Sequence, residues 1–151
     1  MKKLIFLFNA LFLLGACSSN KMLTADEEAT FELQKTSCYG TCPVYTLRLA
    51  EDGRARLRAE EHMDKQGIYK ANFPKGEILA LIDDFEQANF AAFKTEYTST
   101  RSDLPTTYIT FGDMKIMNYD GAPESLEKLQ KKLEAFVDRP EWEKVADLNA
   151  K

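Results

Sequence analysis

The fold of this chain is decided by the stretch VYTLRLAEDGRARLRA, residues 44–59. Apolar residues alternate with polar ones on both sides of a turn: Tyr45, Leu47 and Leu49 before it, and Ala55, Leu57 and Ala59 after it. Successive side chains of a strand point to opposite faces of a sheet, so this alternation indicates two half-buried strands. Glu51-Asp52-Gly53 is a turn signal between them, and the stretch therefore predicts a β-hairpin.

The sequence on either side of this hairpin continues the strand pattern. Phe31, Leu33 and Lys35 alternate with polar neighbours, and a third strand is predicted from Gly67 to Phe73. Two more strands are predicted around a Gly112-Asp113 turn, with Thr107, Ile109 and Phe111 in the first and Met114, Ile116 and Asn118 in the second.

Two other segments have the spacing of helices. Residues 75–93 carry apolar side chains at 3.6-residue intervals and acidic ones on the opposite face, which predicts an amphipathic helix. A second helix is predicted after Pro123, with a core stripe of Leu126, Leu129, Leu133, Phe136 and Val137. Asp138 and Glu141 resemble a capping box, which predicts a short terminal helix that carries Trp142 and Val145.

The order of these elements, β-β-β-α-β-β-α, predicts an α+β fold. Short turns between neighbouring strands favour an antiparallel sheet of about five strands, with two main helices packed on one face. We expect residues 30–151 to form this single domain.

The N-terminal sequence predicts export. Lys2 and Lys3 precede an apolar stretch, Leu4 to Leu14, that is too short to span a bilayer and indicates a cleaved signal peptide. Leu14-Gly15-Ala16-Cys17 forms a bacterial lipobox, so we expect residues 1–16 to be removed and Cys17 to be acylated. Residues 17–29 would then be a lipidated N-terminus and a flexible tether.

The lipid on Cys17 would anchor the protein in a bilayer, and Ser18 at the next position predicts the outer membrane, with the domain facing the periplasm. Removal of Lys2 and Lys3 changes the formal net charge from −4 to −6. Such an acidic protein repels phosphate backbones, so nucleic acid is excluded as a partner.

Cys38 and Cys42 remain as a pair in an oxidising compartment, and we expect a structural disulfide between them. The five-residue loop would contribute about 2 kcal/mol, and Gly40 would supply the unusual backbone angles of so tight a ring.

Two alternatives give these cysteines a chemical role. Thiol-redox catalysis needs a depressed thiol pKa, which a helix N-terminus usually provides, whereas the residues after Cys42 have a strand pattern. Copper binding would use Cys38 and Cys42 with His62 as a third ligand, because the C-x-x-x-C-P spacing is similar to that of copper chaperones of the Sco type. The leading interpretation has no metal and no cofactor.

Several short motifs occur together along the chain: Cys38-Tyr39-Gly40-Thr41-Cys42-Pro43-Val44-Tyr45, Asp52-Gly53, Phe90-Ala91-Ala92-Phe93, Tyr97, Asp103-Leu104-Pro105-Thr106-Thr107, Lys115 and Tyr119-Asp120-Gly121-Ala122-Pro123. Together they resemble a family of bacterial envelope lipoproteins of unknown function with a C-[FY]-G-x-C-P-x-Y signature. The resemblance covers about residues 30–138. It implies a small exported α+β domain and transfers no catalytic residues.

Four arginines on one face of the predicted hairpin are the candidate binding surface: Arg48, Arg54, Arg56 and Arg58, with Tyr45 nearby. Guanidinium groups suit carboxylates and phosphates, and Tyr and Arg dominate protein interfaces. No pair of acid and base with catalytic spacing is evident. The sequence therefore predicts a non-catalytic module that binds another protein or ligand of the cell envelope.

Overall fold

The predicted hairpin forms β2 (Val44–Leu49) and β3 (Arg54–Glu61) in the structure, a computed structural model that describes residues 21–148. Its turn requires the glycine at position 53. Gly53 has a φ of 95°, and a Cβ placed there would lie 2.1 Å from the carbonyl oxygen of Phe73. A side chain at this position would therefore clash with the backbone of Phe73, directly after the strand that follows β3.

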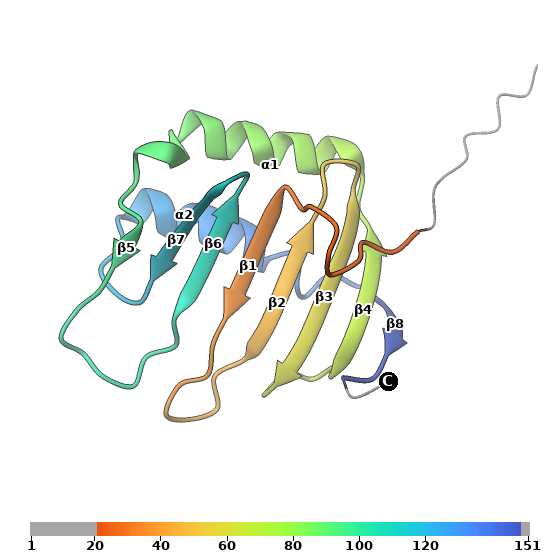
Figure 1. Cartoon of the computed structure of the whole chain (residues 1–151), viewed down its shortest axis with the longest axis horizontal. Coiled ribbons are helices and arrows are strands. Elements are labelled where there is room, and N and C mark those ends of the chain that lie inside the picture. Colours follow the sequence, from red (N-terminus) through yellow and green to blue (C-terminus); the bar gives the residue numbers. More distant parts are fainter. Residues whose placement is uncertain (1–20, 149–151) are drawn as a thin grey trace, which may run out of the picture.

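The hairpin belongs to an eight-stranded sheet with the order β5-β7-β6-β1-β2-β3-β4-β8 (Figure 1). The other strands are β1 (Phe31–Lys35), β4 (Gly67–Asn72), β5 (Glu96–Tyr97), β6 (Thr107–Phe111), β7 (Met114–Asn118) and β8 (Glu143–Ala146). β5 and β7 are parallel and the remaining neighbours are antiparallel. The α+β class is thus confirmed, with a mixed sheet in place of a purely antiparallel one.

The expected count of about five strands is wrong, because the predicted order leaves out three. β1 shows its alternation in the sequence, but its central place depends on pairing with β6, which lies more than seventy residues away. β5 is two residues long in a segment whose polar composition indicates a loop. β8 replaces the predicted terminal helix and pairs with the outer edge of β4.

Two helices supply the other layer, α1 (Lys75–Gln87) and α2 (Glu124–Glu134). α1 ends before residue 93 because Asn89 adopts a left-handed conformation with a φ of 51°, and the chain continues as a short 3-10 helix, η1 (Phe90–Ala92). Phe136 and Val137 are buried as predicted, although they follow the end of α2. Among the described residues, none of the helices is long and apolar enough to cross a membrane.

The core lies between the helices and one face of the sheet. The sheet contributes Phe31, Leu33, Leu47 and Leu57, and the helices contribute Ile78, Leu81, Phe85, Leu126, Leu129 and Leu133. The ring of Phe31 lies 4.9 Å from that of Phe85 and 5.0 Å from that of Phe111, measured between centroids. These contacts fix the helices on this face and leave the opposite face free of them.

The opposite face, here called the open face, is crossed by the residues that precede β1. Residues 21–29 pass in front of the sheet in Figure 1 before the chain enters β1. Leu23 is fully buried but is not part of the main core cluster. Residues 17–20 of the expected flexible tether lie outside the described residues, and residues 21–29 are held against the sheet.

Candidate functional site

A row of charged residues runs straight across the open face. Strand register places Glu32 of β1, Arg48 of β2, Arg56 of β3, Lys70 of β4 and Glu143 of β8 side by side. Side chains at directly opposed positions of neighbouring strands lie within contact distance of one another. The row therefore has three adjacent basic groups at its centre and a carboxylate at each end.

The carboxylates neutralise the outer two basic groups of this row. Arg48 Nε lies 3.2 Å from Glu32 Oε2, although its N–H is not aligned for a hydrogen bond, and Lys70 Nζ lies 3.3 Å from Glu143 Oε2. Arg56, between them, makes no hydrogen bond or ion pair with any described residue, and its Nε is shielded from solvent. The centre of the row is thus a cation without an ion-pair partner among the described residues.

The surroundings of Arg56 make its charge costly. Burial lowers the pKa of this guanidinium, the neighbouring charges of Arg48 and Arg58 lower it further, and Asp26 opposes the change. The group stays protonated, because an arginine pKa is far above neutral pH. An anion placed beside Arg56 would relieve both the repulsion and the unsatisfied N–H.

Arg48 holds the N-terminal segment on the open face. Its Nη1 donates hydrogen bonds to the carbonyl oxygens of Thr24 and Ala25 at 2.8 and 2.6 Å, and its Nη2 donates to that of Glu27 at 2.7 Å. A single guanidinium thus binds three carbonyl groups of a segment that bends at residues 25–27. Arg48 is therefore not free to bind another molecule through these atoms.

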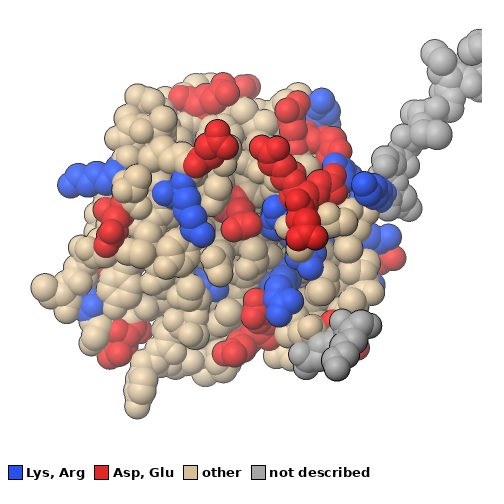
Figure 2. Space-filling model, viewed as in Figure 1, with Lys and Arg blue, Asp and Glu red and all other residues tan. Residues whose placement is uncertain are grey.

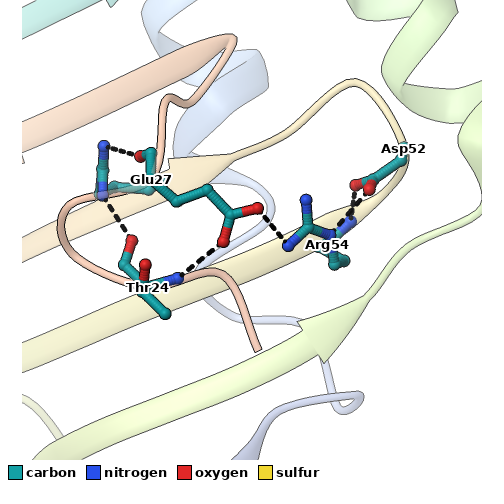
Figure 3. A network of polar contacts seen from close by, with 5 residues as sticks. Thr24, Glu27, Asp52 and Arg54 are labelled. Carbon is teal, nitrogen blue, oxygen red and sulfur yellow. Dashed lines mark hydrogen bonds and ion pairs between the residues drawn. The ribbon is translucent and has the colours of Figure 1, made fainter. Parts of the chain in front are cut away.

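Arg54 fixes the same segment through side chains (Figure 3). Its Nη1 lies 2.6 Å from Glu27 Oε1, and its Nε donates to Asp52 Oδ2 at 2.7 Å. Hydrogen bonding from Arg54 lowers the pKa of the Glu27 carboxyl. Burial would raise the pKa of Asp52, but hydrogen bonds from the side chain and amide of Arg54 outweigh it and lower that pKa. Thr24, Glu27, Arg54 and Asp52 form one network.

The four predicted arginines share a face, but they do not form a free basic patch. Arg58, with a side chain 39% exposed, donates through Nε to Glu60 Oε1 at 3.0 Å. Figure 2, which shows this face, has acidic side chains among the basic ones. Arg48 and Arg54 are engaged by the chain itself, so the surface available to a ligand is centred on Arg56 and Arg58.

Tyr45 is not on the open face with these arginines. It belongs to the core, with only 5% of its surface exposed, and it points to the side of the sheet that the helices cover. The reason is the two-residue period of β2, in which Tyr45 shares its face with Leu47 and Leu49. Its place in the predicted binding surface is therefore corrected.

The cysteine loop connects β1 to β2. Cys38 and Cys42 form a disulfide with their Cα atoms 5.7 Å apart, and the amide of Gly40 donates to the carbonyl oxygen of Cys38 at 2.9 Å. The expectation for Gly40 is wrong: its φ is not in the left-handed region, and a Cβ there would meet nothing closer than the Cys38 sulfur at 3.8 Å. Tyr39 at the tip is 90% exposed.

The alternative metal site is not assembled in this structure. Among residues 21–148, no three His, Cys, Asp or Glu side chains are placed to hold a metal ion, and this includes Cys38, Cys42 and His62. His62 follows β3 with a φ of 54° and lines a cavity with Tyr45. A strand rather than a helix follows Cys42, as the sequence indicates. Cys17, the predicted lipidation site, lies outside the described residues.

The sequence did not reveal the role of residues 21–29. One usable signal is the pair of large apolar side chains Met22 and Leu23 in the otherwise polar or small-residue stretch between Cys17 and Phe31. Backbone carbonyl groups, which bind Arg48, have no sequence signature at all. This part of the site could be found only from the structure.

The family of a domain of unknown function, DUF6438, matches residues 29–137. This range contains the cysteine loop, the arginine row except for its Glu143 end, and both helices. The chain matches no curated protein and no solved structure.

Proposed function

The chain belongs to the DUF6438 family, and we propose that it is a lipid-anchored, non-catalytic binding module of the bacterial cell envelope. In this proposal Cys17 carries the anchor in the outer membrane, and the domain faces the periplasm. The open face binds an anionic group, a carboxylate or a phosphate, that belongs to another envelope component. Arg56 is the centre of the binding surface and Arg58 contributes to it.

The observation that carries this proposal is the missing partner of Arg56. Its neighbours in the row pair with Glu32 and Glu143, whereas Arg56 makes neither a hydrogen bond nor an ion pair with any described residue. Its Nε, like that of Arg48, is also shielded from solvent without a hydrogen bond. Buried polar groups without partners are rare in native proteins, and those that persist commonly mark a site of function. A guanidinium presents a planar fork of donors that matches carboxylate and phosphate oxygens.

The N-terminal segment supports a position close to the membrane. Leu23 lies six residues after Cys17, and six extended residues span at most about 20 Å. Burial of Leu23, together with the bonds from Arg48, fixes the end of this short connection on the open face. A lipid on Cys17 would therefore hold the row near the bilayer surface, where its partner would be another envelope component.

A titration with inorganic phosphate and with acetate tests the ligand class. Amide resonances of β3 and β4 should shift as either anion is added, and Arg56→Gln should weaken binding about tenfold through loss of a charge-assisted hydrogen bond. Lys128→Gln is the matched control, since Lys128 is an exposed basic residue of α2 paired with Glu124. Equal binding by the Arg56 variant and the wild type would contradict the proposal.

Membrane fractionation tests the anchor separately. Cys17→Ala should move the protein from the outer-membrane fraction to the soluble periplasmic fraction or leave its signal peptide uncleaved. Cys42→Ser is the control for replacement of a cysteine elsewhere in the chain. Outer-membrane recovery of the Cys17 variant at the wild-type level would overturn the assignment of Cys17 as the anchor.

A further inference from the structure

A second site lies on the other side of the sheet, at the end where β1 stops and β2 begins. A cavity of about 330 Å³ is bounded there by the strands, the segment after β3 and the C-terminal end of α2. Its polar walls come from Lys35, Tyr45, His62, Asp64, Lys65, Glu134 and Asp138. Because these residues lie on the helix side of the sheet, the cavity is independent of the arginine row and of the function proposed for it.

Tyr45 is the buried polar group of this cavity. The residue is 95% buried, since only 5% of its surface is exposed, and its ring is part of the core. Its hydroxyl makes no hydrogen bond with any described residue, and unlike the Nε atoms of Arg48 and Arg56 it is not shielded from solvent. The hydroxyl is therefore reached through the cavity that Tyr45 lines. A tyrosine in this position ordinarily finds a hydrogen-bond partner. The cavity is where such a partner would bind.

The two lysines of the cavity already have partners in the protein. Lys35 Nζ lies 2.7 Å from Glu134 Oε1, and Lys65 Nζ donates to the carbonyl oxygen of Val137 at 3.0 Å. Glu134 is held in place from the other side, because Gln130 Nε2 donates to the same oxygen at 2.8 Å. Glu134 therefore neutralises Lys35, whereas the carbonyl group of Val137 fixes the position of Lys65 and leaves its positive charge in place.

Once the Lys35–Glu134 pair is set aside, Lys65 contributes one positive charge and Asp64 and Asp138 contribute two negative charges, so the cavity keeps a net charge of −1. Asp64 and Asp138 make no hydrogen bond or ion pair through their side chains with any described residue, and both line the cavity. Burial raises the pKa of the Tyr45 hydroxyl, and the negative charges of Glu134 and Asp138 raise it further. The carboxylates of Glu134 and Asp138 thus act on the Tyr45 hydroxyl at the cavity wall, and a cation placed there would have negative charges nearby.

Apolar groups complete the wall. Pro43, Met63 and Val137 line the same cavity, and Met63 packs against the main core. A pocket with a few fixed polar groups and an apolar wall favours a ligand that has both characters. A bare metal ion would gain nothing from this wall, and no three metal-ligating side chains gather among the described residues.

We propose that this cavity binds an organic cation, a primary ammonium or guanidinium group on an aliphatic stem. The Asp138 carboxylate and the Tyr45 hydroxyl accept hydrogen bonds from the head group, Asp64 adds negative charge at the wall, and the stem lies along Met63 and Val137. This chemistry is offered by a free alkylamine and by a lysine or arginine side chain of a partner protein.

Calorimetry on the lipidated full-length protein in detergent micelles tests this site. n-Pentylammonium should bind, while n-pentanol, with the same stem and no charge, and pentanoate, with the opposite charge, should bind at least tenfold more weakly. Pentanoate binding as tight as that of pentylammonium would overturn the proposal, because Lys35 and Lys65 would then determine the ligand. Equal binding of pentanol would overturn it as well.

Variants locate the binding. Asp138→Asn should weaken pentylammonium binding about tenfold, and Tyr45→Phe, which keeps the buried ring, should weaken it severalfold. Asp83→Asn, on the exposed side of α1, and Tyr108→Phe, on β6, are the matched controls and should bind as the wild type does. Unchanged binding in both Asp138→Asn and Tyr45→Phe, with the fold intact by circular dichroism, would show that the amine binds elsewhere.

Binding measurements with two peptides distinguish the two sources of the cation. The peptide acetyl-Gly-Lys-Gly-amide presents the same ammonium on a protein backbone, and its alanine counterpart is the control. Tighter binding of the lysine peptide than of pentylammonium would assign the site to a protein partner, and the reverse order would assign it to a free amine. Failure of both to bind would overturn the proposal while leaving the anion site at Arg56 untouched.

Discussion

The two faces of the sheet are covered in different ways. On one face, α1 and α2 pack apolar side chains against the strands, with Phe31, Phe85 and Leu126 among those fully buried. On the other face, residues 21–29 are held mainly by guanidinium groups, through three carbonyl oxygens bonded to Arg48 and one carboxylate bonded to Arg54. Only Leu23 adds a fully buried aliphatic side chain there.

This difference predicts different stability for the two coverings. Burial of apolar area is additive over many residues and nearly independent of pH and salt. A segment held by a few polar contacts opens locally, at a free energy below that of global unfolding. The helices should therefore separate from the sheet only when the whole domain unfolds, while residues 21–29 should detach from a folded domain.

The largest effect is expected from a change under the helices. Phe85→Ala removes a fully buried ring that contacts Phe31 and Phe111, and we expect a loss of about 3–5 kcal/mol in the free energy of unfolding. Urea denaturation followed by circular dichroism measures it. Leu79→Ala, on the same helix but 40% exposed, should change the value by less than about 1 kcal/mol. Equal losses would contradict the assignment of this face as the core.

The disulfide loop belongs to neither covering, since it joins the ends of β1 and β2. Replacing Cys38 and Cys42 together by Ser should lower the free energy of unfolding by about 2 kcal/mol, the entropy of closing so short a loop. The proposed anion and amine binding should survive. Copper binding or thiol-dependent activity that disappears in the double variant would favour the alternative function instead.

The helix-covered face was largely predictable from the sequence, because its signals are local. The alternation in residues 44–59 and the stripe from Leu126 to Val137 name buried side chains correctly. The sequence pattern does not show which strands pair with one another. β1 pairs with β6 across more than seventy residues, and β8 was interpreted as a helix because Asp138 and Glu141 imitate a cap. Glu141 instead binds Arg139, which also pairs with Glu77 of α1.

The candidate site was predictable only in part. Two-residue periodicity places the four arginines on one face, yet it says nothing of which arginine keeps a free charge. That depends on strand register, which puts Glu32 beside Arg48 and Glu143 beside Lys70, and on backbone carbonyls of residues 24–27. Tyr45 was included in the binding surface because its residue type suggests an interface, although the alternation in β2 already places it with Leu47 and Leu49 on the buried face.

A smaller effect is expected from a change on the open face. Arg48→Met removes the donors that bind residues 24–27 and should release this segment without unfolding the domain. We expect a loss of about 1.5 kcal/mol, the value of one hydrogen bond to a charged group, because the freed segment regains conformational entropy. Trypsin should cleave after Lys21 faster than in the wild type.

The matched control for Arg48→Met is Arg58→Met, on the same face. Arg58 bonds Glu60 and makes no hydrogen bond or ion pair with residues 21–29, so the rate of cleavage after Lys21 should stay at the wild-type value. Equal acceleration by both variants would mean that general loss of positive charge, rather than the specific bonds of Arg48, releases the segment.

The smallest effect is a dependence on pH that is confined to the N-terminal segment. Arg54 lowers the pKa of Glu27 below its ordinary value of 4.5, so the folded state favours the carboxylate. The contribution of this pair is therefore complete above pH 4.5 and is lost as the pH falls through the lower pKa of the folded protein. The amide of Thr24, which donates to Glu27 at 3.4 Å, reports this change in NMR spectra. Its titration midpoint should lie below 4.5 and disappear in Glu27→Gln but not in Glu28→Gln. A midpoint at or above 4.5 would mean that Arg54 does not hold the segment in solution. Residues 21–29 would then be held on the open face by the hydrogen bonds of Arg48 and the burial of Leu23 alone.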